Sequence, residues 1–231
     1  MTRESPLQAR RNALIKAWLT PYLRDRGFTK KGNVYTRLVT DVVHIIDVQQ
    51  ESYNKDEAVS FALNIGVHIP GVLACAHRGK EPEKLFAAVG IVHTRPGQVV
   101  VPKRKSWWYV NATDDPSKDH EIGRDLQSTV EEGAFRRFFD RFQNKRAVAE
   151  FHLAPREKPD QQIDPRCESR AVLYAGIIWD QLGEYDKCRA AMARAAELAH
   201  GKRLEADIEK FAREYVCGQL PRVDSAHVDK E

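Results

Sequence analysis

The chain has 231 residues, of which 42% are hydrophobic and 30% charged, a balance typical of a folded globular protein with one large domain or one domain plus an appendage. Its longest aliphatic run is Val99–Val101, which excludes a membrane-spanning segment, because such a segment needs roughly 20 apolar residues. The net charge of +4 hides an asymmetry: residues 1–37 carry nine basic and two acidic residues, a net charge of +7.

The basic segment over residues 1–37 limits the kinds of partner that the protein could bind. It could attract phosphates or an acidic protein. A basic, solvated helix face is the more common explanation of such a charge run, and we favour it over a nucleic-acid surface.

The cysteines and histidines bear on metals and location. Cys75, Cys167, Cys188 and Cys217 form no C-x-x-C pair, and the eight histidines form no zinc-binding pattern. We therefore expect four reduced thiols, no metal site and no cofactor. The start of the chain lacks the apolar core of a signal peptide, so we expect a cytoplasmic protein.

A helix is predicted at the N-terminus. Ser5 and Pro6 form a good N-cap and first-turn pair, and apolar residues recur at helical spacing to about Arg26. Pro21 predicts a kink, and Gly27 is placed to end the helix.

Three strands are predicted next. Val34–Thr40 and Val42–Gln49 are rich in β-branched and aromatic residues and predict a hairpin. Residues 61–67 alternate strictly between large apolar and small side chains. Because the second face of this strand carries small groups, we expect a neighbouring layer to approach it closely.

The pattern between Pro70 and Lys105 is weaker. It predicts a short helix over Glu81–Val89, a strand over Ile91–Arg95 and a turn at Pro96 and Gly97. A strand over Trp107–Val110 and a long amphipathic helix over Ile122–Phe142, broken at Gly133, follow. The fold class is therefore α+β: an N-terminal helix, an antiparallel sheet and a closing helix.

Together these residues carry a resemblance. The pattern G-F-x-K-K-G-x-x-Y-x-R from Gly27, the hairpin ending at Gln49 and Ser52, and F-x-L-N-x-G-V from Phe61 occur in this order. With the tryptophan pair before a helix that ends in aromatic residues, they resemble an uncharacterised bacterial family, domain of unknown function 4304, over about residues 7–150. The resemblance implies no activity and no catalytic residues.

A helical module is predicted after a boundary rich in proline. Apolar and small residues over about 169–202 resemble one tetratricopeptide repeat, and Leu204 to Tyr215 predicts a capping helix. In this register Cys188 is a packed core thiol. We expect an α+β domain over 1–153, a linker over 154–168, the module over 169–217 and a disordered tail over 218–231. Packing of the hairpin on the first domain, or a homodimer through it, explains the module at least as well as partner recognition does.

The candidates for chemistry are weak. Gly27 and Gly32 have the opening spacing of a phosphate-binding loop, but Asn33 and Val34 replace its Lys-Ser/Thr pair, so no phosphate loop is predicted. Asp47, Glu51, Asp56 and Glu57 are best explained as solvated loop carboxylates. No catalytic residue is assigned.

The tryptophan pair suggests an interface. Adjacent strand residues face opposite ways, so one tryptophan faces the core and the other points outward. If the outer one is exposed beside Lys30, Lys31 and Arg37, it is an interface anchor.

The leading hypothesis is therefore a non-enzymatic bacterial protein-binding protein of regulatory or immunity type. One alternative is a nucleic-acid-associated protein that uses the basic N-terminal face and Lys103–Trp108. A second is an enzyme with a pocket that gathers Arg37, Gln49, Ser52 and Asn64. The candidate binding residues are Lys30, Lys31, Arg37, Gln49, Ser52, Asn64, Trp107 and Trp108.

Overall fold

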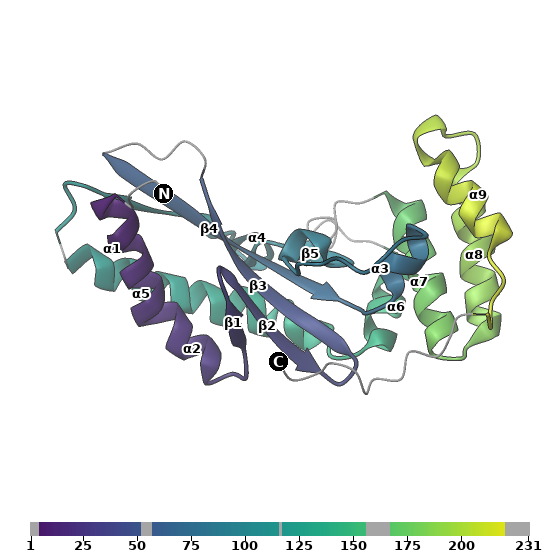
Figure 1. Ribbon diagram of the computed structural model, residues 1–231, viewed down its shortest axis with the longest axis horizontal. Coiled ribbons are helices and arrows are strands. Elements are labelled where there is room, and N and C mark those ends of the chain that lie inside the picture. The colour runs from purple at the N-terminus through teal and green to yellow at the C-terminus, as the bar shows by residue number, and fades with distance from the viewer. Residues whose placement is uncertain (1–4, 52–56, 116, 156–166, 220–231) are drawn as a thin grey trace.

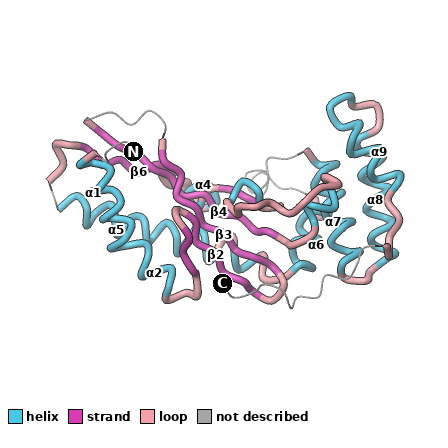
Figure 2. The backbone as a smooth tube through the Cα atoms, in the orientation of Figure 1, coloured by secondary structure: helices cyan, strands magenta, loops and turns pink. Residues whose placement is uncertain are grey.

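The computed structural model describes residues 5–51, 57–115, 117–155 and 167–219, and the fold is α+β as predicted. A six-stranded antiparallel sheet forms the centre. Figure 1 shows α1, α2 and α5 together at the left of the view, whereas α3 and α6 to α9 gather at the right. Figure 2 shows the strands running between these two groups of helices.

The N-terminal helix is continuous but changes its winding. Helix α1 (Pro6–Leu14) begins at Ser5, whose side chain forms a capping box with Gln8. A π-helical segment, Ile15–Leu19, then leads into α2 (Thr20–Arg24). The predicted irregularity therefore lies just upstream of Pro21. Proline cannot donate to the carbonyl four residues earlier and crowds it, and a wider π turn relieves this conflict.

The predicted hairpin and the strand after it are confirmed. The strands are β1 (Thr29–Lys31), β2 (Val34–Val39), β3 (Val42–Gln50), β4 (Ala58–His68), β5 (Val92–Thr94) and β6 (Trp107–Asn111). Their order is β1-β2-β3-β4, and β5 and β6 both pair with β4 on its other side. The short edge strand β1 was not predicted. Between Glu81 and Val89 the prediction of a helix is wrong except for one 3-10 turn, η2 (Ala87–Val89).

The small-residue face of β4 is closely approached, as predicted. A Cβ atom added to Gly66 would lie 2.6 Å from the carbonyl oxygen of Ala87 in η2. Short helices α3 (Val72–Ala76) and α4 (Pro96–Val99) flank this covering segment, and α4 replaces the turn predicted at Pro96.

The closing helix also changes its winding. Helix α5 (Ser117–Thr129) passes into a π-helical segment, Val130–Arg136, and then into a 3-10 turn, Phe139–Arg141. The predicted break near Gly133 is therefore a local widening of the helix. Phenylalanines of this region pack edge to face beneath the sheet.

The C-terminal helices pack on the sheet-bearing part of the chain. They are α6 (Lys145–Leu153), α7 (Glu168–Gln181), α8 (Tyr185–Ala199), the turn η6 (Arg203–Glu205) and α9 (Ala206–Glu214). Every residue from Ala171 to Asp180 in α7 is buried. Helices α3 and α6 contact α7, as do α8 and α9, and one hydrophobic cluster extends from α1 to α9. The tail predicted to be disordered lies outside the described residues from position 220 onward.

One expectation about the cysteines is wrong. Cys188 and Cys217 form a disulfide with their Cα atoms 6.4 Å apart, whereas Cys75 and Cys167 are free. Cys188 is therefore not a core thiol. The pairing arises because the chain turns back after α9 and brings Cys217 against α8, a tertiary contact that cysteine spacing does not reveal. Among the helices of the described ranges, none has an apolar stretch of the length that a bilayer span needs.

Candidate functional site

Polar side chains gather on the sheet face that points away from α1, α2 and α5, beside the part of that face that η2 covers at Gly66; it is here called the open face. Strand register places Asp47 of β3 opposite Asn64 of β4, and Ala62 of β4 between Gln49 of β3 and Trp107 of β6. Alternate residues of a strand share a face, so these polar residues and Trp107 lie on the same side of the sheet.

Hydrogen bonds join these residues to Arg95, which follows β5. The Asn64 Nδ2 donates to Asp47 Oδ1 at 2.9 Å and to Gln49 Oε1 at 3.1 Å. Arg95 donates from Nε to Asn64 Oδ1 and from a terminal nitrogen to Gln49 Oε1, both at 3.2 Å. Its guanidinium carbon lies 5.0 Å from the centroid of the Trp107 ring. We call Asp47, Gln49, Asn64, Arg95 and Trp107 the Arg95 cluster.

Arg95 forms no ion pair with any residue that the structure describes. Its two acceptors are neutral amides, and in the described part of the chain no carboxylate oxygen lies within 4.0 Å of the guanidinium. The nearby Asp47 is buried, and its second oxygen accepts from the backbone N–H of Ala87. The cluster therefore holds a cation in a fixed position, with its second terminal nitrogen free to donate.

Comparison with known families identifies the family of the part of the chain that contains the Arg95 cluster. A family described as a domain of unknown function, DUF4304, matches residues 19–134, which is half of the chain. The chain belongs to this family. No curated protein and no solved structure matches it. The DUF4304 match contains all six strands and the whole Arg95 cluster, and it ends before α6.

The two tryptophans of the DUF4304 domain face opposite ways, as predicted. Trp108 is buried under α5, stacks on Phe61 at 5.7 Å between ring centroids, and donates from Nε1 to Asp125 at 2.8 Å. Trp107 is partly exposed on the open face. It lies beside Arg95 and not beside Lys30 or Lys31, because β1 and β6 are on opposite sides of the sheet.

Of the other predicted site residues that the structure describes, Arg37, Lys30 and Lys31 lie apart from the cluster. Arg37 lies on the helix-covered face, where it donates to the Arg26 carbonyl at 3.0 Å and to His44 Nδ1 at 3.1 Å. Burial lowers the pKa of Arg37. Arg37 therefore cannot share a pocket on the open face with Gln49 and Asn64. Lys30 and Lys31 are exposed on β1, and Ser52 lies outside the described residues.

Much of the basic N-terminal segment is structural. Arg10 forms a 3.0 Å ion pair with Asp119, and Arg26 forms a 2.9 Å ion pair with Glu131. Arg11 is buried. The basic residues described as exposed in this segment are Lys16, Arg24, Lys30 and Lys31. The sequence charge of +7 therefore overstates the positive surface available to a polyanion.

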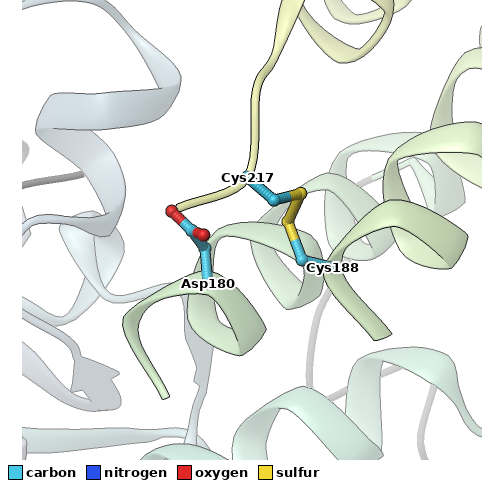
Figure 3. A group of neighbouring side chains, drawn as sticks. All are labelled: Asp180, Cys188 and Cys217. Carbon is cyan, nitrogen blue, oxygen red and sulfur yellow. A yellow bond between two sulfur atoms is a disulfide. The ribbon is translucent and has the colours of Figure 1, made fainter. Parts of the chain in front are cut away.

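One group of side chains has the donor types of a metal site. Asp180, Cys188 and Cys217 bring their donor atoms within 4.8 Å of one another. Figure 3 shows the two sulfur atoms bonded to each other beside the carboxylate. Because metal binding requires thiolates, the disulfide removes two of the three donors.

Sequence reasoning missed Arg95 and misassigned Asp47. Arg95 lies between Pro70 and Lys105, where the periodicity of apolar residues is weakest. Its position at the end of a predicted strand was the available signal for a binding role. Asp47 was predicted to be a solvated loop carboxylate, but it is 8% exposed within β3. Its position inside a run of apolar strand residues was the available signal.

Proposed function

We propose that this protein binds another protein through the open face of its sheet, with Arg95 and Trp107 as central contacts, and that it is not an enzyme. The observation that carries the proposal is the Arg95 guanidinium, held by two neutral amides and an indole with no carboxylate partner in the described residues. The partner is expected to supply that carboxylate.

The residue types of this face support the proposal. Arginine, tryptophan and tyrosine are enriched among the residues that dominate binding energy at interfaces. Tyr109 of β6 lies on the same face as Trp107 and is 54% exposed. An arginine that is already ordered loses less side-chain entropy on binding, and its free nitrogen can make a charge-assisted hydrogen bond to a carboxylate.

The engagement of the other polar atoms favours binding over catalysis. Both oxygens of Asp47 accept hydrogen bonds within the protein, so this carboxylate is not presented as a general base. Asn64 and Gln49 are committed to positioning Arg95. The cluster contains no nucleophile with an adjacent base.

We further propose that α7, α8 and α9 form a tetratricopeptide-like module that buttresses the DUF4304 domain. A Cβ atom on Gly176 of α7 would lie 2.9 Å from Met192 Cε of α8, a close approach of the kind that such hairpins require. The outer face of α8 carries Lys187, Arg189 and Arg194, which favours contact with solvent over a homodimer through this helix.

The setting we propose is the bacterial cytoplasm, where the protein acts as a regulatory or immunity-type partner. In that compartment the Cys188–Cys217 disulfide is exposed to cellular thiols that can reduce it.

Capture from extracts of the native host tests the proposal. Tagged wild-type protein, Arg95→Ala and Trp107→Ala are compared by quantitative mass spectrometry of the proteins they retain. Arg24→Ala serves as the control, because Arg24 is an exposed arginine on α2. The proposal predicts a protein retained by wild type and Arg24→Ala and lost by both cluster variants. Equal retention by all four, or turnover of a metabolite without a protein partner, would contradict it.

A further inference from the structure

The segment after α9, Tyr215–Gly218, lies across the end of α7 and is here called the strap. Its two ends bind the same carboxylate: Tyr215 Oη donates to Asp180 Oδ2 at 2.8 Å, and the backbone N–H of Gly218 donates to Asp180 Oδ1. Between them, Cys217 is bonded to Cys188 of α8 (Figure 3). Two hydrogen bonds to Asp180 and the disulfide to α8 therefore help to hold the strap.

The strap is a wall shared by two hollows. A groove of about 500 Å³ runs between α8 and α9, and its lining includes Met192, Ala196 and Ala212 together with Tyr215 and Cys217. A smaller hollow of about 230 Å³ is lined by Cys75, Arg78, Phe211 and Glu214 together with Tyr215 and Val216. Displacement of the strap would join the two hollows and expose the apolar side chains of α8 and α9.

The two sulfurs differ in accessibility. Cys188 is fully buried in α8, whereas Cys217 is partly exposed and lines the larger groove. Thiol–disulfide exchange requires a thiolate to reach one of the sulfurs, so attack is favoured at Cys217 Sγ.

We propose that Cys188–Cys217 is a redox-controlled latch that holds the strap over α7 when oxidised and releases it when a dithiol reductant cleaves it. A thiolate of the dithiol attacks Cys217 Sγ and forms a mixed disulfide, while Cys188 leaves as a thiolate and takes up a proton. The second thiol of the dithiol attacks its own bridging sulfur and releases Cys217 as a thiolate, which is also protonated. The dithiol is oxidised to a disulfide, and the protein gains two thiols.

The environment of Asp180 explains why release follows reduction. Asp180 is 6% exposed, and in the described ranges no basic side chain lies within 4.0 Å of its carboxylate. Burying a carboxylate without a cation costs free energy. Once the strap moves away, water can hydrate the Asp180 carboxylate and remove this cost. The disulfide and the two hydrogen bonds from the strap to Asp180 oppose this opening, and reduction removes the covalent bond. This inference is independent of the Arg95 cluster.

Hydrogen exchange measured by mass spectrometry tests the latch on the full chain, with and without a reducing dithiol. Reduction should raise exchange of backbone amides in residues 206–218 by about tenfold or more, and leave the β4 amides unchanged. Cys217→Ser should exchange like the reduced protein without reductant. The control Cys167→Ser, which removes a free thiol, should exchange like oxidised wild type.

Thiol counting under non-reducing conditions provides a second readout. The latch predicts that labelling reaches only Cys75 and Cys167 before reduction, and all four cysteines afterwards. Labelling of all four in the native protein purified without reductant, or equal exchange of residues 206–218 in both redox states, would overturn the proposal.

Discussion

The guanidinium of Arg95 and the ring of Trp107 are in contact across the open face, with 5.0 Å between the guanidinium carbon and the ring centroid. The two residues come from different segments that both pair with β4: Arg95 follows β5, and Trp107 begins β6. Strand β4 thus brings together a cation and an aromatic ring that are separated in the sequence by residues 96–106, where the periodicity of apolar residues is weak.

The two tryptophans should separate stability from binding. Trp108→Ala removes a buried ring and its hydrogen bond to Asp125, so it should lower the free energy of unfolding by about 3–5 kcal/mol. Trp107→Ala removes a partly exposed ring and should cost about 1 kcal/mol while abolishing partner capture. Urea denaturation of both variants measures the first quantity. Equal destabilisation by the two substitutions would contradict the assignment of their faces.

His44 should make the fold sensitive to acid. Its Nε2–H donates to the Phe142 carbonyl at 2.8 Å, which leaves Nδ1 to accept from Arg37. Burial first, and then the Arg37 charge, lower the pKa of His44 to about 4, although its bond to Phe142 opposes the shift. Between about pH 6.5 and 4 the unfolded state therefore binds a proton that the folded state does not, and stability falls as the pH falls.

Denaturation at pH 7 and pH 4.5 measures this effect. Wild type should lose about 2 kcal/mol more than His44→Gln between these pH values. His77→Gln, at an exposed histidine, should retain the wild-type pH dependence. If His44→Gln showed the same loss as wild type, His44 would not be held neutral.

Gly66 should not tolerate a methyl group. Because an added Cβ would meet the Ala87 carbonyl oxygen at 2.6 Å, Gly66→Ala should cost about 2 kcal/mol of stability. At Gly79 the nearest atom would be 3.7 Å away, so Gly79→Ala is a matched control with little expected effect. Thermal unfolding compares them, and identical melting temperatures would show that η2 does not pack against β4 as described.

Arg10 should behave as a structural residue. Its side chain donates to Asp119 and to the carbonyl oxygens of Asn111 and Asp114. Arg10→Ala should therefore lower the free energy of unfolding by about 1–2 kcal/mol, after allowance for its partial exposure. Lys16→Ala, at an exposed position of the same helix, should be near neutral. If Arg10→Ala left the free energy of unfolding unchanged, Arg10 would not be a structural residue, and binding of an external polyanion by the N-terminal segment would gain support.

The regular parts of the fold were predictable because local pattern determines them. Ser5 and Pro6 predict the start of the first helix. The alternation of large and small side chains over 61–67 predicts β4 and the close approach of a neighbouring segment to one of its faces. Length and phenylalanine spacing likewise indicate the closing helix. Where side-chain periodicity is strong, burial of one face leaves few alternatives.

The candidate site was only partly predictable, since tertiary contacts assemble it. Gln49, Asn64 and Trp107 were named from sequence, but Arg95 joins them only because β5 and β6 share β4 as a partner. Arg37 was grouped with them, yet strand register puts it on the opposite face. The Cys188–Cys217 pair depends on how the chain returns after α9, which no local signal encodes.

Calorimetric titration of the captured partner into wild type, Arg95→Lys and Arg95→Ala measures how much Arg95 contributes to binding. If Arg95 is a central contact, Arg95→Ala should weaken binding by about 2 kcal/mol or more. Arg95→Lys should be intermediate, because lysine keeps the charge but loses the planar fork that Gln49, Asn64 and Trp107 hold. Three equal dissociation constants would contradict a role for the Arg95 cluster in binding.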